Sequence, residues 1–260
     1  MPVADATAEL VAPPDWLTLD FISDLHLQAG EPETFNAWQR YMHNTPADAV
    51  FILGDLFEVW VGDDILQERG FEHQCAHVMQ QTTARAPVFL MHGNRDFLAG
   101  NALMAASNAA LLSDPTVLTF HNQRWLLSHG DALCVGDVGY MQFRQLVRSA
   151  GWQQAFLAKP LAERQAIARS LRQQSEAAKL TTTDYADPDC LDVNPNAARQ
   201  ALSQANSAML IHGHTHKPAL HDLGNDLQRI VLSDWDAAAT PPRAEVLRLS
   251  AQGLQRISLV

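Results

Sequence analysis

Short apolar runs recur along the chain and predict buried strands. Each run is four or five residues long and is bounded by polar or turn-forming residues, which suits a strand better than a helix. Between the runs, apolar positions at helical spacing predict helices over residues 34–42, 71–83 and 140–149. Alternating strands and helices are typical of an α/β fold. The predicted strands are residues 19–23, 49–53, 88–91, 117–120, 125–128 and 209–212.

The two ends of the chain have different patterns. Residues 1–16 contain two adjacent prolines and no apolar period, so we expect a loose extension followed by one domain over residues 17–260. At the other end, residues 229–233, 244–249 and 254–259 alternate or run apolar around a turn. This pattern predicts an antiparallel finish to a sheet.

A region from Trp152 to about Lys179 interrupts the succession of strands. Its apolar residues lie near helical spacing, with several Arg and Lys between them. We interpret it as part of a helical cap insertion, about residues 138–190, that lies over the site. Such an apolar stripe more often packs on a core, although a basic amphipathic helix can also lie on a bilayer surface.

Composition limits the classes of function. A chain of 260 residues with 47% hydrophobic content can bury one large core, and three cysteines without C-x-x-C spacing indicate reduced thiols in the cytosol. Neither a leader pattern nor an apolar run long enough for a membrane span is present. The net charge of −11 argues against general binding of nucleic acid, because phosphate backbones require clustered Lys and Arg. An anionic substrate would therefore need help from metal ions.

Nearly every predicted strand runs directly into Asp, His, Asn or Gly. Asp24 and His26 follow the first strand, and a period of two projects both side chains to the same side. Asp55 follows the next strand after Gly54, and its two carboxylate oxygens can bridge two ions. Strand ends that deliver polar side chains are where an α/β sheet usually builds a site.

Later strand ends add more donors of the same kind. Asn94 offers an amide oxygen, and His129, His214 and His216 offer imidazoles. Any one of these polar motifs alone is common in turns. Five such motifs in order, each directly after an apolar strand, indicate a metal centre. Seven donors suit two divalent ions that lean toward octahedral coordination. The remaining histidines lack partners in the pattern and are expected on the surface, in packing or at strand ends: His43, His73, His77, His92, His121, His212 and His221.

The order D-x-H, G-D, G-N-x-D, H-G-D and G-H-x-H resembles the calcineurin-like metallophosphoesterases over most of the chain. The resemblance implies a four-layer α-β-β-α sandwich and two divalent ions, often Mn²⁺. One ion would be held by Asp24, His26, Asp55 and His216. The other would be held by Asp55, Asn94, His129 and His214. Asp96 and Asp131 would orient these ligands.

Arg95 limits the kind of leaving group that the site can accept. Two ions about 3.5–4 Å apart activate water and favour in-line displacement at phosphorus. Relatives often carry a histidine beside the Asn, where it can protonate an alkoxide leaving group, whereas arginine keeps its proton and binds phosphate bidentately. The leaving group should then need little protonation, which favours cleavage of a diphosphate. Asp55, Asn94 and Arg95 are the expected catalytic residues.

Three sequence segments, at residues 54–64, 93–98 and 192–194, resemble one particular branch of this family. That branch cleaves UDP-2,3-diacylglucosamine into UMP and 2,3-diacylglucosamine 1-phosphate in lipid A biosynthesis. The resemblance implies an apolar acyl groove in the cap and a protein, expected to be monomeric, on the cytoplasmic face of the inner membrane. Asp63 and Asp64, which lie in the first of these segments, could have a structural role instead of a functional one, by stabilising a turn through side-chain hydrogen bonds. The implied substrate contacts are Asn94, Arg95, Asp137, Tyr140, Ser175, Lys179 and His214.

Two rival functions remain open. Another metallophosphoesterase, acting on soluble or cyclic nucleotides, would share the metal residues but would not use an apolar cap groove. A non-catalytic docking scaffold would be expected to lose metal ligands, and all seven are present here.

Overall fold

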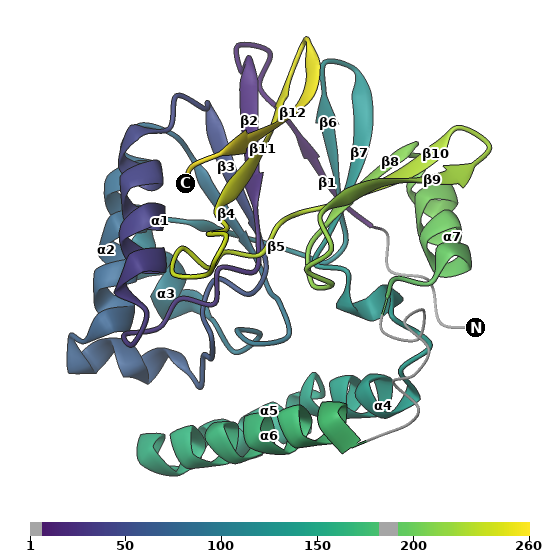
Figure 1. Ribbon diagram of the computed structural model, residues 1–260. Coiled ribbons are helices and arrows are strands. Elements are labelled where there is room, and N and C mark those ends of the chain that lie inside the picture. Colours follow the sequence, from purple (N-terminus) through teal and green to yellow (C-terminus); the bar gives the residue numbers. More distant parts are fainter. Residues whose placement is uncertain (1–6, 182–191) are drawn as a thin grey trace.

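The computed structural model describes residues 7–181 and 192–260, and the side chains of residues 174–181 lie outside the described part. Within this part, twelve strands form two mixed, six-stranded sheets that lie face to face (Figure 1). The first sheet has the order β12-β11-β2-β3-β4-β5, with β2 to β5 parallel. Its strands are β2 (Thr18–Ile22), β3 (Ala49–Leu53), β4 (Val88–Met91), β5 (Ala110–Leu112), β11 (Glu245–Ser250) and β12 (Gly253–Ser258).

The second sheet has the order β1-β6-β7-β8-β10-β9, with β7, β8 and β10 parallel to one another. Helices cover the outer face of each sheet, so the predicted α-β-β-α sandwich is confirmed (Figure 1). Helices α1 (Pro32–Asn44), α2 (Phe71–Thr83) and α3 (Asn101–Ser107) pack on the first sheet, and α7 (Pro195–Ala205) packs on the second. The strands of the second sheet are β1 (Ala8–Val11), β6 (Thr116–Phe120), β7 (Gln123–Ser128), β8 (Met209–His212), β9 (Ala219–Gly224) and β10 (Leu227–Val231).

The continuous apolar character of the central strands follows from burial on both faces. In β3, Val50 and Ile52 face the helices, whereas Phe51 faces the second sheet. Phe51 stacks between Phe21 of β2 and Phe89 of β4, at ring-centroid distances of 5.1 and 4.8 Å. This row of aromatic rings fixes the relative register of the three strands that end in the candidate site.

Helix α1 shows why the helical pattern was readable from sequence. A proline stands in its first turn, where its fixed φ suits a helix and its missing N–H is not needed. The buried positions repeat at three- and four-residue intervals and form one stripe against the sheet. They are Thr34, Ala37, Trp38, Tyr41 and Met42.

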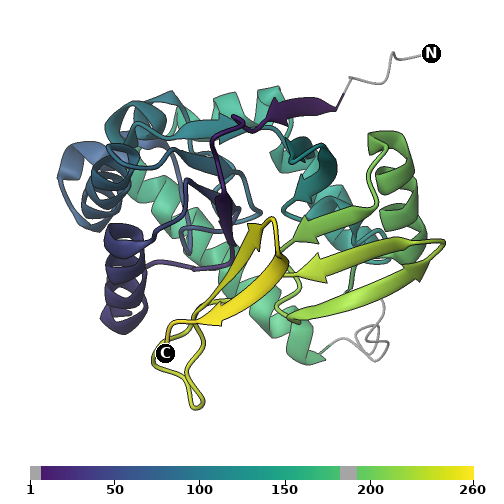
Figure 2. The same ribbon diagram turned by 90° about the horizontal axis from the view of Figure 1, so that it is seen from above.

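Three helices lie beyond the sheets, below both of them in Figure 1 and behind them in Figure 2. They are α4 (Val138–Val147), α5 (Ala150–Leu157) and α6 (Leu161–Thr181), and we call them the cap. They fall within the range expected for the insertion, whose residues 182–190 lie outside the described part. Trp152, Leu161 and Ile167 pack against the core, as a core stripe should. None of the described helices is long and apolar enough to cross a membrane.

Two expectations for the chain ends are wrong in part. Residues 8–11 are not loose, because they form β1 and pair in parallel with β6. The strand expected at 229–233 starts two residues earlier, as β10, and belongs to the second sheet, where it pairs with β8 and β9. The antiparallel pair β11 and β12 is confirmed in the first sheet.

A buried carboxylate ties the C-terminal strands to the rest of the first sheet. Asp20 on β2 has no exposed surface and accepts two hydrogen bonds from Arg248 of β11, at 2.7 and 2.8 Å. The hydroxyls of Tyr41 and Thr45 donate to the same carboxylate at 2.9 and 2.7 Å. These partners satisfy a charge that would otherwise be costly to bury.

Replacing Arg248 should therefore destabilise the fold strongly. Arg248→Met leaves the buried Asp20 carboxylate without its counter-charge, and we expect the free energy of unfolding to fall by about 3–5 kcal/mol. Urea titration followed by circular dichroism measures it. Arg40→Met, at an exposed position on α1, is the matched control and should change it by less than about 0.5 kcal/mol. Equal effects of the two variants would contradict this account.

Candidate metal centre

Strands β2, β3, β4, β7 and β8 end at one edge of the sandwich, the edge that faces the cap (Figure 1). The seven predicted metal-binding residues follow these strand ends directly. The structure brings all seven together in two overlapping clusters that share this edge. Each cluster contains carboxylate or amide oxygens together with imidazole nitrogens.

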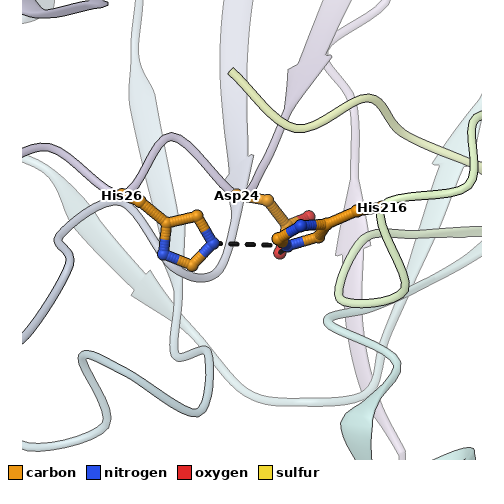
Figure 3. Close-up of side chains that lie close together, drawn as sticks. All are labelled: Asp24, His26 and His216. Atoms are coloured by element: carbon orange, nitrogen blue, oxygen red, sulfur yellow. Dashed lines mark hydrogen bonds and ion pairs between the residues drawn. The ribbon is translucent and has the colours of Figure 1, made fainter. Parts of the chain in front are cut away.

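The first cluster consists of Asp24, His26 and His216 (Figure 3). The Nε2 atoms of His26 and His216 lie 3.3 Å apart. His216 Nε2 is also 3.3 Å from Asp24 Oδ1. Asp24 is fully buried, whereas the imidazole of His216 is partly exposed. The cluster thus opens toward solvent at one side.

The second cluster forms around Asn94. Its Oδ1 atom lies 3.0 Å from His129 Nε2 and 2.9 Å from His214 Nδ1. Asp55 lies between the clusters, because its Oδ2 atom is 3.8 Å from His129 Nε2 and 4.0 Å from His26 Nε2. Asp55 is therefore within 4.0 Å of an imidazole nitrogen from each side.

The backbone at these strand ends is strained. Left-handed φ values are uncommon for residues other than glycine and cluster at functional sites. Surrounding hydrogen bonds hold the conformation: the backbone N–H of His26 donates to the Asp55 carbonyl at 3.1 Å, and that of His214 donates to Asp24 Oδ2 at 2.9 Å. Five of the seven residues have such a φ, between 49° and 68°: Asp24, His26, Asp55, His214 and His216.

Two glycines allow the loops to approach each other. A Cβ atom on Gly93 would overlap the Asp55 carboxylate and backbone nitrogen, and a Cβ atom on Gly213 would overlap the Asp24 carboxylate. Only glycine fits at these close approaches. The glycines of the G-N-x-D and G-H-x-H motifs are thus needed for space beside the ligands.

The electrostatics of the site favour a cation. Burial alone would lower the pKa of His129, but the charges of Asp55, Asp24 and Asp131 raise it to about 9. Burial raises the pKa of Asp55 above its usual value, against the opposing charges of His129 and His26. The three carboxylates therefore favour a positive charge at the position of His129. Burial and the charge of His129 lower the pKa of His214 to about 3, which keeps this imidazole neutral and able to coordinate a metal.

The donor set fits divalent ions. Among the described residues, two groups of three His and Asp side chains bring one donor atom each within 4.8 Å of one another: Asp24 with His26 and His216, and Asp24 with Asp55 and His129. Imidazole nitrogens and carboxylate oxygens in this number are ligands for first-row divalent metals. Neighbouring lone pairs that converge without a bound cation would repel one another, so a divalent ion relieves this repulsion.

Asp96 fixes two loops of the centre, and Asp131 lies near His129 and contacts the cap. Asp96 accepts hydrogen bonds from the backbone N–H groups of Leu56 and Gly93, each at 2.8 Å, and so fixes the loops that carry Asp55 and Asn94. Asp131 follows His129 by two residues. Burial would raise its pKa, but the charges of His129 and Arg144 hold that pKa well below its usual range.

Asp131 also joins the centre to the cap. Its Oδ2 atom accepts hydrogen bonds from the Tyr140 hydroxyl at 2.6 Å and from Arg144 Nε at 2.8 Å. The ring of Tyr140 stacks on that of His214, with centroids 5.9 Å apart. Tyr140 is thus placed at the metal centre. Asp137 caps the N-terminus of α4 by accepting a hydrogen bond from the Tyr140 backbone N–H at 2.8 Å.

The other predicted substrate contacts are placed less completely. The backbone N–H of Arg95 donates to Asp55 Oδ1 at 2.8 Å. Its guanidinium has no hydrogen-bond or ion-pair partner among the described residues, which leaves it available to an anion. Ser175 and Lys179 belong to α6, but their side chains lie outside the described residues.

For Asp63 and Asp64 the structure favours the structural alternative. Asp63 Oδ2 accepts from the backbone N–H of Ala102 in the first turn of α3, at 2.7 Å, and Asp63 Oδ1 accepts from Trp60 Nε1 at 3.0 Å. Asp64 pairs with the buried Arg164 of α6. These two acids fasten loops and the cap and do not point into the metal centre.

Sequence reasoning missed two residues that reach the site. Arg148, the residue that follows α4, donates to the Gly93 carbonyl at 2.8 Å and lies over the Phe97 ring at 5.0 Å. Glu58 is nine-tenths buried and lies beside His26. A charged residue inside the otherwise apolar run 56–61 was the available signal for Glu58. Arg148 carried no such signal, because arginine on a predicted helix is usually solvated.

Comparison with known proteins finds similar chains over nearly the whole length of this one. UDP-2,3-diacylglucosamine hydrolase of Chromobacterium violaceum is 44% identical over 250 residues, covering 94% of this chain and 99% of its own. The protein of the same name from Ralstonia nicotianae is 44% identical and covers 88% of each chain, and that from Bordetella pertussis is 40% identical and covers 95% of each. Among solved structures, an archaeal phosphodiesterase is 12% identical and covers 93% of this chain and 99% of its own, with a TM-score of 0.47.

The model of the calcineurin-like phosphoesterase family matches residues 17–218, a span that contains all seven clustered donors and the cap. The match therefore covers most of the chain and includes each strand end described above. With its sandwich of two mixed sheets and its convergent His and Asp side chains, this chain belongs to the calcineurin-like phosphoesterase family and is a divalent-metal hydrolase.

Proposed function

We propose that the protein hydrolyses the pyrophosphate bond of UDP-2,3-diacylglucosamine, releasing UMP and 2,3-diacylglucosamine 1-phosphate for lipid A biosynthesis. The observation that carries this proposal is the similarity, at 44% identity over nearly the whole of both chains, to a UDP-2,3-diacylglucosamine hydrolase. The clustered donors at the strand ends supply the chemistry that such a reaction needs.

The seven donors would hold two ions, which we propose to be Mn²⁺. Asp24, His26, Asp55 and His216 would hold the first. Asp55, Asn94, His129 and His214 would hold the second. The position of Asp55 Oδ2, within 4.0 Å of imidazoles from both groups, supports its role as the bridge. When bound, two such ions neutralise phosphate charge and activate water for in-line attack at phosphorus.

The chain's own residues would bind and orient the diphosphate. Arg95 extends from the same loop as Asn94, and its backbone N–H holds Asp55 in place. Its guanidinium can grip two phosphate oxygens at once without giving up a proton. A phosphate monoester leaves from a pyrophosphate without needing a proton at neutral pH, so Arg95 suits a diphosphate better than an alkyl ester. Tyr140 and Asp137 would contact the glucosamine end.

The cap offers apolar surface for the acyl chains. A hollow of about 560 Å³ beside α4 is lined by Val135, Val138 and Met141, together with Arg144 and Arg148. Arg148 also donates to the Gly93 carbonyl, so it links this hollow to the loop that carries Asn94. Leu146 on α4 has 57% of its surface exposed. We propose that this face receives the acyl chains and contacts the cytoplasmic surface of the inner membrane, with Ser175 and Lys179 as further cap contacts.

Substrate selectivity tests the proposal. Mn²⁺-dependent release of UMP should be rapid with UDP-2,3-diacylglucosamine and much slower with UDP-N-acetylglucosamine, because only the former fills the cap. Asp55→Ala should abolish release from both, since it removes the proposed bridge. Chromatographic detection of UMP measures the rates. Turnover of only bis(p-nitrophenyl) phosphate would retain the metal site but overturn the lipid substrate in favour of soluble nucleotides.

A cap variant separates the acyl face from the metal chemistry in the same assay. With substrate in phospholipid vesicles, Leu146→Gln should lower the ratio of acylated-substrate turnover to diester turnover. Leu220→Gln, an equally exposed position on β9 away from the cap, is the matched control and should leave the ratio unchanged. An unchanged ratio in Leu146→Gln would contradict the proposed acyl and membrane face.

The role of Arg95 gives a third prediction for this site. Arg95→Ala should lower kcat/KM by about 10²–10³-fold, the usual cost of losing one preorganised donor to a charged transition state. Metal content should stay at two ions per chain, because the substitution keeps the backbone N–H that holds Asp55. Steady-state kinetics and elemental analysis measure the two quantities. Loss of metal in Arg95→Ala would show that this residue supports the centre and is not a phosphate clamp.

A further inference from the structure

Glu58 is placed in strict register with the loop that carries His26. Its backbone N–H donates to the Leu27 carbonyl at 3.1 Å, and Leu27 pairs with Phe57 in an isolated parallel bridge. The Glu58 side chain is nine-tenths buried. The segment after β3 therefore presents a buried carboxylate to the metal centre at a fixed position.

The Glu58 carboxylate lies against the outer nitrogen of His26. His26 Nδ1 is 3.1 Å from Glu58 Oε2, and this buried nitrogen has no hydrogen-bond partner among the described residues. A carboxylate at this place favours the proton on Nδ1. The lone pair of Nε2 is then directed toward Asp24, Asp55 and His216, where the first ion would sit. Metal-binding histidines commonly have a carboxylate in this position.

The other oxygen of Glu58 meets the cap. Arg172 of α6 forms an ion pair with Glu58 Oε1. Two helical turns earlier on α6, the buried Arg164 pairs with Asp64 and donates to the Val61 carbonyl. The two arginines are eight residues apart and share one face of the helix. Helix α6 is thus fastened along segment 58–64, with Arg172 at the end nearest to His26.

We propose that Glu58 is a positioning residue for His26. Through Arg172, this positioning depends on the packing of α6 of the cap against segment 58–64. The proposal rests on the role assigned above to His26 as a metal ligand. A buried carboxylate needs partners for both oxygens. Here one partner is the metal ligand and the other belongs to the cap, so displacing α6 frees Glu58 to turn away from His26. The position of α6 against segment 58–64 and the affinity for the first ion are thereby linked.

Mn²⁺ titration of the metal-free protein tests this link without an activity assay. Calorimetry should resolve two binding events in the wild type. Glu58→Gln should weaken one of them by about 10–100-fold, the usual effect of losing a carboxylate that orients a ligand, and leave the other unchanged. Glu68→Gln, at an exposed position in the same region, is the matched control and should alter neither event.

A double-mutant cycle of Glu58 and Arg172 tests whether Arg172 acts through Glu58. Arg172→Met should weaken the same event as Glu58→Gln, by less, and should add nothing when Glu58 is already Gln, because Arg172 acts through Glu58. Arg169→Met, one turn away and exposed, should have no effect. Additive losses would overturn the link to the cap. The unfolding midpoint of metal-free Glu58→Gln should match that of the wild type, and a lowered midpoint would assign the effect to the fold and overturn the positioning role.

His26→Ala separates failure of this inference from failure of the proposed function. If His26→Ala loses one binding event and Glu58→Gln keeps both at wild-type affinity, the positioning role is wrong and the ligand set stands. If His26→Ala itself keeps both events, the proposed ligand set is wrong. Selective loss in both variants is the result that supports the positioning role.

Discussion

The structure depends on bringing buried carboxylates and imidazoles together at one edge of two packed sheets. Asp24 and Asp55 are fully or almost fully buried and lie near His26, His129 and His216. Such a cluster is unfavourable on its own, because desolvated charges repel and several of these residues have left-handed backbones. Divalent ions offset the charge, and the rigid sandwich offsets the strain.

The core explains how that strain is carried. The loops that hold the metal residues leave strands that are locked by the stack of Phe21, Phe51 and Phe89. Behind the loops, Asp96 and Asp131 accept hydrogen bonds from the chain segments that must not move. The cap is joined to the same elements through Arg148, Arg164 and Arg172. Fold, metal centre and cap are therefore one mechanically continuous unit within the described residues.

Sequence predicted most of the strands, and the polar side chains that meet at their ends, because both signals are local. An apolar run followed at once by Asp-x-His or Gly-Asp indicates where a strand ends and which polar side chains lie at that end. Contacts between distant segments leave no such record. Strand β1 pairs with β6 far along the chain, so residues 8–11 looked loose. The start of α7 at Asn194 and Pro195 carried the usual capping signal but was not recognised. The pairing of Glu58 with His26 and Arg172 depends on three separate segments, so only the structure could reveal it.

The central claim is that Asp55 bridges two divalent ions at these strand ends. Electron paramagnetic resonance of the Mn²⁺-loaded protein tests it most directly, because spins of ions about 3.5–4 Å apart are magnetically coupled. The account predicts two Mn²⁺ per chain with a coupled spectrum, and loss of the coupling in Asp55→Ala. A wild-type spectrum of a single ion, or of two uncoupled ions, would contradict it.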